Sequence, residues 1–332
     1  VIDLSLVDYS FVGEATDDNA GYSVSSSGDV DGDGLDDILI SSPFNNDGGY
    51  NAGKIYVIFG SSLGYTSVIE LSTADYSFTG EAEGEMVGIS VSSAGNVDGD
   101  GFDDILIGAM YNDDGGYNAG KTYLIFGSSL GSISEICLSM ADYSFIGEEL
   151  SDYSGGAVSS AGDVDGDGFS DILIGAYGND DGGMDSGKAY LIFGSSLGYT
   201  SVIELSTADY SFIGENDNDL LSGSVSSAGD VDGDGLDDIL IGAYGNDDGG
   251  TDAGKAYLIF SSSLGSSNTI NVSTADYSFL GDNDNDYAGI SVSSGGDVDG
   301  DGFDDVLIGA YLNNDGGTAA GKVGLFKACP VQ

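Results

Sequence analysis

The chain has 332 residues, 57 of them acidic and only 6 basic, which gives a formal net charge of −51. A surface this acidic repels nucleic acid and anionic membranes. The sequence contains no histidine and no arginine, which excludes imidazole metal ligands, histidine-based catalytic triads and bidentate phosphate clamps. Because 40% of the residues are hydrophobic, including 20 tyrosines and 14 phenylalanines, the charge does not indicate disorder.

A unit of 67 residues is repeated five times in constant register. The landmark that reveals the period is a Phe-X-Gly tripeptide, and each copy is followed by the same series of segments. A period of this length indicates that each unit is one piece of supersecondary structure that packs against its neighbours. The copies of the landmark begin at Phe11, Phe78, Phe145, Phe212 and Phe279.

The first unit contains four short segments with the composition of β-strands and none with helical periodicity. Residues 21–26 alternate in polarity and precede an Asp/Gly-rich loop at 29–37, which leads into the β-branched segment 38–40. After an Asn/Asp-Gly-Gly loop come a third strand at 54–59 and a fourth at 68–71. The pattern predicts an all-β chain in which each unit is one four-stranded antiparallel blade of a β-propeller. An open stack of units is the alternative.

The first residues of the sequence supply the strand that the fifth unit lacks. Residues 1–5 repeat the sequence of 68–72, and the fifth unit stops before its own copy of that segment. We therefore expect one domain over 1–332, a five-bladed β-propeller closed by the N-terminal strand joining the last blade. The expected blades are approximately 8–72, 73–139, 140–206, 207–273 and 274–332 plus 1–7.

The Asp/Gly-rich loop has the pattern of a calcium-binding loop. Acidic side chains stand at positions 1, 3, 5 and 9, a backbone carbonyl is available at position 7 and a glycine at position 6 permits the tight turn, which matches the oxygen ligands that Ca²⁺ prefers. Position 12 is Ile40 rather than the Glu of helix–loop–helix sites, so the loop is expected to join two strands. Five copies predict about five structural Ca²⁺ per chain. The expected ligands are Asp29, Asp31, Asp33, Leu35, Asp37, Asn96, Asp98, Asp100, Phe102, Asp104, Asp163, Asp165, Asp167, Phe169, Asp171, Asp230, Asp232, Asp234, Leu236, Asp238, Asp297, Asp299, Asp301, Phe303 and Asp305.

An ordinary turn without metal is the alternative interpretation, because Asp and Gly are common turn formers. Against it, four carboxylates within nine residues would repel one another strongly without a cation. Asn96 replaces the first aspartate in the second copy, so that site keeps an oxygen ligand but loses a charge and should bind more weakly. Five Ca²⁺, ten positive charges in all, would change the formal charge only from −51 to −41. Such loops fit an extracellular fluid with millimolar Ca²⁺.

Two cysteines break the repeat. Cys137 lies in the predicted fourth strand of the second unit and Cys329 in the turn after the third strand of the last, in blades that would not be neighbours in a five-bladed ring. Edge positions there should exceed the Cα–Cα distance of about 4.4 to 6.8 Å that a disulfide tolerates. The pair is expected either to link one molecule to the next, which would propagate a filament or tubule, or to be two unrelated thiols.

Five of the six lysines recur at one position, the start of the third strand. Local pairing with the acidic loops is expected for them, and ligand binding is the alternative. The loops at this end, opposite the calcium loops, also include the most variable acidic segments, which are either solvated turns or a surface for a partner or cation. The recurring lysines are Lys54, Lys121, Lys188, Lys255 and Lys322.

Four features of the second unit, with counterparts in every other unit, point to a known family: Phe-Thr-Gly at 78–80, Gly-Asn-Val-Asp-Gly-Asp-Gly-Phe-Asp-Asp at 95–104, Ile-Gly-Ala at 107–109 and Gly-Lys-Thr-Tyr at 120–123. Over essentially its whole length the chain resembles the FG-GAP repeats of the integrin α-subunit β-propeller. The resemblance implies extracellular display, a calcium ion in each hairpin, and adhesion or protein recognition on the opposite face. Integrin propellers have seven blades where this chain has five units, and no other integrin domain is present.

The leading hypothesis is a non-catalytic, calcium-stabilised extracellular or cell-surface propeller for adhesion or protein–protein interaction, and a self-associating subunit of a surface filament or tubule. We expect a secretory signal to have been removed, and neither nucleic-acid binding nor membrane insertion. A carbohydrate-binding lectin is the second hypothesis, because the variable loops include Tyr22, Tyr153 and Tyr287, although tryptophan is absent. A hydrolase is third, since carboxylates are abundant but no acidic pair stands out from the repeat.

Overall fold

The computed structural model describes residues 7–64 and 66–328, and this part of the chain is all-β. The strands are β1 (Ser10–Val12), β2 (Val24–Gly28), β3 (Asp37–Ser42), β4 (Lys54–Ile58), β5 (Val68–Glu70), β6 (Tyr76–Thr79), β7 (Val91–Gly95), β8 (Asp104–Ala109), β9 (Lys121–Ile125), β10 (Glu135–Cys137), β11 (Tyr143–Ile146), β12 (Ala157–Gly162), β13 (Asp171–Ala176), β14 (Lys188–Ile192), β15 (Val202–Glu204), β16 (Tyr210–Ile213), β17 (Leu221–Gly229), β18 (Asp238–Ala243), β19 (Lys255–Ile259), β20 (Thr269–Asn271), β21 (Tyr277–Leu280), β22 (Ala288–Gly296), β23 (Asp305–Ala310) and β24 (Lys322–Phe326).

Helical structure in the described residues is limited to short 3₁₀ turns, which flank the outer strands β5, β10, β15 and β20. No described helix has the length and apolar character needed to cross a membrane. The turns are η2 (Gly60–Ser62), η3 (Leu71–Thr73), η4 (Gly127–Ser129), η5 (Leu138–Met140), η6 (Gly194–Ser196), η7 (Leu205–Thr207), η8 (Ser261–Ser263) and η9 (Val272–Thr274).

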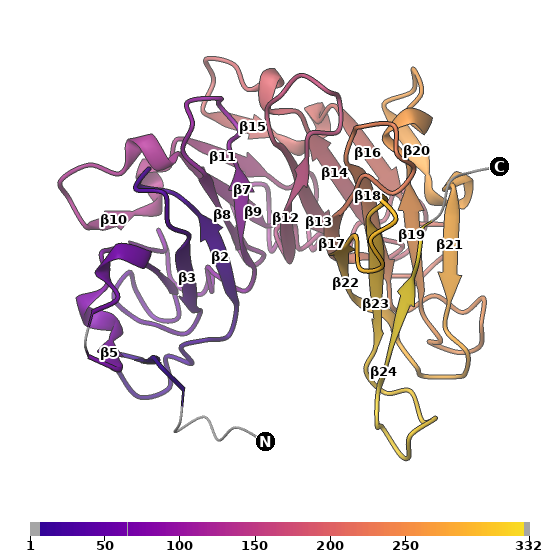
Figure 1. Cartoon of the computed structure of the whole chain (residues 1–332), viewed down its shortest axis with the longest axis horizontal. Coiled ribbons are helices and arrows are strands. Elements are labelled where there is room, and N and C mark those ends of the chain that lie inside the picture. Colours follow the sequence, from indigo (N-terminus) through magenta and orange to yellow (C-terminus); the bar gives the residue numbers. More distant parts are fainter. Residues whose placement is uncertain (1–6, 65, 329–332) are drawn as a thin grey trace.

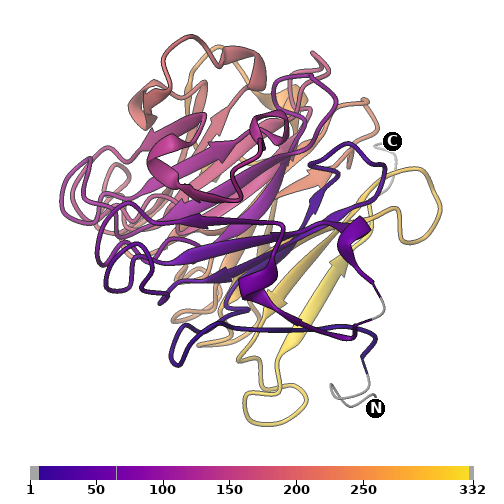
Figure 2. The same cartoon turned by 90° about the vertical axis from the view of Figure 1, so that its left-hand side faces the viewer.

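Each repeat contributes one sheet, and the sheets follow one another along an arc (Figure 1). The strand orders are β10-β6-β4-β3-β2, β15-β11-β9-β8-β7, β12-β13-β14-β16-β20, β17-β18-β19-β21 and β22-β23-β24, with β1 and β5 forming a separate pair. The first strands of consecutive repeats lie side by side on the inside of the arc, and β10, β15 and β20 lie on its outside (Figure 1). With the N-terminal repeats turned toward the viewer, the strands of successive repeats overlie one another and loops gather at both ends (Figure 2).

In the first four sheets, the fourth antiparallel strand differs from the sequence prediction. The predicted strand at 68–71 does not pair with β4; instead, β4 pairs with β6 and places Ile55 opposite Phe78. β5 pairs in parallel with β1, and β10 pairs in parallel with β6, so each of these segments adds an outer strand to the repeat before it. The physical reason is burial, since Phe78 is fully buried whereas Val68 is 52% exposed. The Phe-X-Gly landmark is therefore part of the sheet itself.

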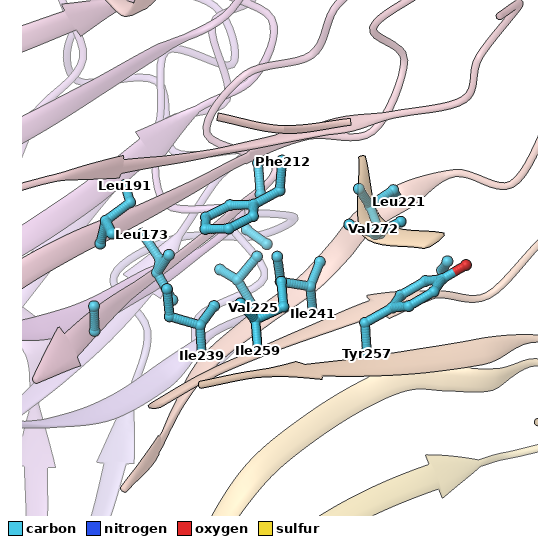
Figure 3. Close-up of a cluster of buried hydrophobic side chains, with 14 of the residues drawn as sticks. Leu173, Leu191, Phe212, Leu221, Val225, Ile239, Ile241, Tyr257, Ile259 and Val272 are labelled. Atoms are coloured by element: carbon cyan, nitrogen blue, oxygen red, sulfur yellow. The ribbon is translucent and has the colours of Figure 1, made fainter. Parts of the chain in front are cut away.

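The core lies between neighbouring sheets. Along β8, Ile105 and Ile107 pack toward the preceding repeat, and Leu106 packs toward the following one. Because a sheet between two neighbours is buried on both faces, its central strand has a continuous apolar run. Figure 3 shows the junction of the third and fourth repeats, where Phe212 meets Ile239 from the next sheet.

Ring closure is not observed in the described residues. β2 and β22 stand at opposite ends of the arc, and no strand within 7–64 or 66–328 pairs with β24 on its outer side. The strand expected to close the ring, residues 1–5, lies outside the described residues, so closure remains a prediction. Cys329 also lies outside them. Cys137 is half-buried in β10, where its sulfur accepts a hydrogen bond from the Ser139 hydroxyl at 3.2 Å, and the predicted link between the cysteines remains untested.

Candidate metal centres

Each Asp/Gly-rich loop joins the first two strands of a repeat and folds around its first side chain. In the first loop, Asp29 Oδ1 accepts the N–H groups of Gly32 at 2.7 Å and Asp33 at 3.0 Å, and Asp29 Oδ2 accepts that of Gly34 at 2.9 Å. Gly32 and Gly34 have φ values of 77° and 88°, a left-handed conformation that explains why glycine occupies these two positions. The loop thus needs both the acid and the glycines.

The loops bring together the carboxylates that the sequence predicts as ligands. In four of the five loops, within the described residues, three carboxylates each offer an oxygen, and these oxygens lie within 4.8 Å of one another. In the second loop Asn96 takes the first position, and its Oδ1 accepts the Gly99 N–H at 2.9 Å as Asp29 does for Gly32. The converging groups are Asp29, Asp31 and Asp33; Asp163, Asp165 and Asp171; Asp230, Asp232 and Asp234; and Asp297, Asp299 and Asp301.

The aspartate at position 9 anchors the loop to the rest of its repeat. Asp37 is 1% exposed; its Oδ2 accepts the Val30 N–H at 3.0 Å and its Oδ1 accepts the Gly60 N–H at 2.8 Å. Burial raises the pKa of Asp37 to about 6, although these two hydrogen bonds act to lower it, and the nearby carboxylates raise it further. Burial likewise raises the pKa of Asp104 to about 7. A buried carboxylate beside several others needs positive charge nearby to stay ionised.

The residues of the loops fit Ca²⁺. They offer only oxygen ligands, most of them carboxylates, and these oxygens converge in a loop whose charges otherwise repel one another. When bound, the ion supplies two positive charges that offset part of the negative charge of this cluster. The chain's own residues supply the ligands and, through Asp37, tie the loop to the turn after β4.

The fifth loop differs from the others in one contact. Lys327 stands where the other repeats have phenylalanine, and its Nζ lies 3.1 Å from Asp299 Oδ2. A lysine ammonium beside a ligand carboxylate competes with a metal ion for the same oxygen. The fifth loop is therefore expected to bind Ca²⁺ more weakly than the first.

The position 7 residues, whose carbonyls are predicted ligands, have a second role that the sequence alone does not reveal. Phe102 packs against the loop of the preceding repeat, where a Cβ on Gly32 would lie 2.4 Å from its ring. Phe169 covers Gly99 in the same way. The large apolar side chain at position 7 of every loop was the available signal. The packing of Phe102 on Gly32 and of Phe169 on Gly99 means that neighbouring Asp/Gly-rich loops are in contact.

The recurring lysines pair locally, as expected. Lys54 Nζ lies 3.0 Å from Glu14 Oε1 and 2.7 Å from Asp47 Oδ2. Burial alone would lower the pKa of Lys54, but the hydrogen bonds to Asp47 and Glu14 outweigh it and raise the pKa. Lys121, Lys188, Lys255 and Lys322 each pair with two acids in the same positions.

Some of the variable acidic segments contain a structural acid that the sequence does not distinguish from its solvated neighbours. Asp152 is 2% exposed, and its Oδ2 accepts Asn179 Nδ2–H at 2.9 Å and the Glu149 N–H at 3.2 Å. The sequence signal that could have identified this acid is an asparagine at a fixed position in each Asn/Asp-Gly-Gly loop, 27 residues after the acid. The acid–asparagine pairs are Asp18 with Asn45, Glu85 with Asn112, Asp152 with Asn179, Asp219 with Asn246 and Asp286 with Asn313.

Asp152→Asn is expected to remove part of the pH dependence of stability. Burial raises the pKa of Asp152 from 3.8 to about 6, so the folded state binds the extra proton. The stability that this group contributes is fully present below about pH 4 and is lost as the pH rises through 6. In saturating calcium, urea unfolding should show that the variant loses about 1–3 kcal/mol less than the parent between pH 4 and 7.5. The exposed Glu149→Gln is the matched control, and a variant profile parallel to the parent's would contradict the assignment.

Tyrosines gather at the same end of the sheets, opposite the calcium loops. Tyr153 stacks on Tyr177 with ring centroids 5.3 Å apart and meets Tyr111 of the preceding repeat edge-on at 5.9 Å. Tyr287 lies 6.4 Å from Tyr244 and 5.8 Å from Tyr311 in a second such group. Partly exposed aromatic rings that bridge two repeats are suited to contact a ligand. Two of the three tyrosines expected in a binding surface, Tyr153 and Tyr287, thus stand at the centre of these groups.

Comparison with known proteins identifies the family of the chain. The chain is 30% identical to integrin alpha-PS2 of Drosophila melanogaster over 178 residues, which is 52% of this chain and 12% of the relative. It is 30% identical to integrin alpha pat-2 of Caenorhabditis elegans over 243 residues, 68% of this chain and 18% of the relative, and 30% identical to integrin alpha-V of Gallus gallus over 237 residues, 70% and 20%. The chain thus spans a fifth or less of the length of these relatives. The FG-GAP repeat matches residues 20–58, 87–125, 154–192, 222–259 and 288–326, more than half of the sequence, and the chain therefore belongs to the FG-GAP repeat family.

Proposed function

We propose that the chain is a calcium-stabilised, non-catalytic module for adhesion or protein–protein recognition outside the cell or at its surface. Each repeat serves as one blade of a propeller-type array, and about five Ca²⁺ per chain have a structural role. The integrin alpha relatives support an adhesive role, because their repeats are of the same family. The match covers only a small part of those proteins, so the partner of this chain is a separate question.

The observation that carries the proposal is that the two ends of the sheets present different groups of side chains. The carboxylates that could hold Ca²⁺ gather at one end. The two tyrosine groups and the variable segments lie at the other, on a frame of ion pairs such as Lys188 with Glu148 at 2.9 Å. Binding surfaces are commonly built from loops held by a rigid scaffold. We therefore assign ligand binding to the tyrosine-bearing end, with calcium stabilising the scaffold.

The test is to apply beads coated with the chain, in millimolar calcium, to arrays of extracellular-matrix proteins and of glycans. Calcium-dependent binding to protein spots is expected, and Tyr153→Ser should weaken it about tenfold because an aromatic anchor is lost. Tyr199→Ser is the matched control, since Tyr199 is fully exposed and lies in a turn at the calcium end. Binding to glycans alone would favour a lectin instead. No binding on either array would contradict the proposed binding surface, and hydrolysis of array glycosides would contradict a non-catalytic role.

A further inference from the structure

Consecutive repeats are joined by the same backbone hydrogen bonds at all four junctions. At the first junction, on the tyrosine-bearing end, the Met86 N–H donates to the Asn51 carbonyl and the Val87 N–H to the Ala52 carbonyl, both at 3.0 Å. The bond made by Val87 recurs between Ser154 and Ala119, between Leu221 and Ser186, and between Ala288 and Ala253. A junction is thus a fixed pairing of one repeat's acidic segment with the loop of the repeat before it.

A second set of contacts joins the repeats at the calcium end. The Asp103 N–H donates to the Asp29 carbonyl at 3.0 Å, and Asp103 Oδ2 accepts the Asp29 N–H at 2.9 Å. The backbone bond recurs between Ser170 and Asn96, Asp237 and Asp163, and Asp304 and Asp230. The carboxylate bond recurs at the last two of these junctions. Together with the packing of Phe102 on Gly32, these contacts fix the register of one repeat on the next.

Both halves of such a junction are present, and unused within the described residues, at the two ends of the arc. At the N-terminal end, the Ala20 N–H and the Asp36 carboxylate correspond to those of Val87 and Asp103. At the C-terminal end, the Ala320 carbonyl and the Asp297 N–H correspond to those of Ala52 and Asp29. None of the four makes a junction bond within the described chain. Gly300, the counterpart of Gly32, has nothing within 4 Å of a Cβ placed on it.

The C-terminal end face is also apolar. Val298, Val323 and Leu325 are 55%, 68% and 41% exposed. Their counterparts in the first repeat are Val30, Ile55 and Val57, and each of these is 0% exposed because the second repeat covers it. Within the described residues, these positions of the surface that a following repeat would cover are therefore exposed on the fifth.

The N-terminal end face is the complementary surface. Val24 is 65% exposed, whereas its counterpart Val91 is 6% exposed against the first repeat. Leu35, at position 7 of the first loop, is 51% exposed, while its counterpart Phe102 is half-buried against Gly32. Each end thus displays the half of a junction that the other end lacks.

We propose that the C-terminal end face of one copy (Asp297, Val298, Ala320, Val323 and Leu325) binds the N-terminal end face of a second copy (Ala20, Val24, Leu35 and Asp36) in the register of the internal junctions. The contact continues an interface that the chain already builds four times. Bringing the two faces together within one chain would require every packed junction of the arc in Figure 1 to change, whereas a second copy requires no such change.

The two faces are different surfaces, so the contact is head-to-tail. Such a contact leaves a free end on each new copy and extends into a helical filament, or into a larger ring if the rotation closes. Asp36 and Asp297 lie within calcium loops, and copies with a net charge of −51 repel one another. Association is therefore expected in calcium, which reduces the negative charge of both loops, and not in chelator. This inference rests on the proposed interaction role and names one partner for it.

Analytical ultracentrifugation of the full chain in calcium tests the inference. The parent should form species larger than a monomer, increasing with concentration. Val24→Glu and Val323→Glu, which alter opposite end faces, should each weaken association by at least about tenfold, because each buries an unpaired charge in the contact. Val202→Glu is the matched control, since Val202 is 50% exposed on the outer strand β15 and lies on neither end face. A monomeric parent, or equal effects of all three variants, would overturn the proposal. Either result would leave the ligand-binding test intact.

Cross-linking separates a second copy from closure of the chain on itself. Val24→Cys and Val323→Cys are made in separate chains and also together in one chain, all with Cys137→Ser and Cys329→Ser, and treated with a short bismaleimide in calcium. We expect linked dimers when the two single variants are mixed, and a ladder from the double variant. An internal link in the double variant at high dilution, without a ladder, would show that the ring closes on itself and would overturn the proposal.

Discussion

Removing calcium is expected to lower the melting temperature of the chain by about 20 °C. Each loop that binds Ca²⁺ at about one hundred times its dissociation constant contributes about 2.7 kcal/mol, and the contributions of five loops add. For a chain of this size, each kcal/mol corresponds to about 1.5 °C. Without the ion, Asp29, Asp31 and Asp33 offer oxygens within 4.8 Å of one another beside the buried Asp37. Their repulsion acts in the folded state and is relieved by unfolding.

The measurement is circular dichroism during heating, in millimolar calcium and in chelator. Adding sodium chloride to the calcium-free sample should restore part of the loss, because salt screens exposed carboxylates. The chelator already saturated with calcium is the control for effects of the chelator itself. The same melting temperature in chelator and in calcium would refute a structural role for the ions.

Phe212→Ala is expected to lower the free energy of unfolding by about 3–5 kcal/mol, the range for removing a large buried aromatic side chain. Phe212 is fully buried, stands opposite Ala189 in its sheet and packs in the cluster that joins the third and fourth repeats (Figure 3). Its truncation opens a cavity in the apolar layer between two sheets. Urea unfolding in calcium measures the loss.

Phe11→Ala is the matched control, because Phe11 holds the same position in the first repeat but is half-exposed. A smaller loss, about 1–2 kcal/mol, is expected for it at concentrations where the chain is monomeric. An equal loss in the two variants would contradict the assignment of the core to the junctions between sheets.

The sequence predicts the repeat, the all-β class and the loops well, because each depends on local chemistry. Aspartates and glycines at fixed spacing specify the turn around Asp29, and the structure gathers the carboxylates as the spacing indicates. The recurring lysines were placed correctly for a similar reason, since Lys54 has few basic competitors and many nearby acids.

The fourth strand was assigned wrongly because two adjacent segments both have strand composition. Residues 68–71 and β6 differ in how deeply they are buried, which depends on the neighbouring repeat and not on either segment alone. The role of Asp152 was missed for a different reason, since its partner Asn179 lies 27 residues away in another loop of the same repeat. How one repeat packs on the next depends on the curvature of the arc, and the 67-residue length of the repeat does not specify that curvature.

Calorimetric titration of the calcium-free chain with Ca²⁺, supported by native mass spectrometry, tests the central claim most directly. Four to five ions per chain should bind, and Asp29→Asn with Asp33→Asn should remove one of them. The fifth loop, where Lys327 contacts Asp299, should fill last. A chain that folds fully and binds no Ca²⁺, or that loses no ion in the double variant, would contradict the account.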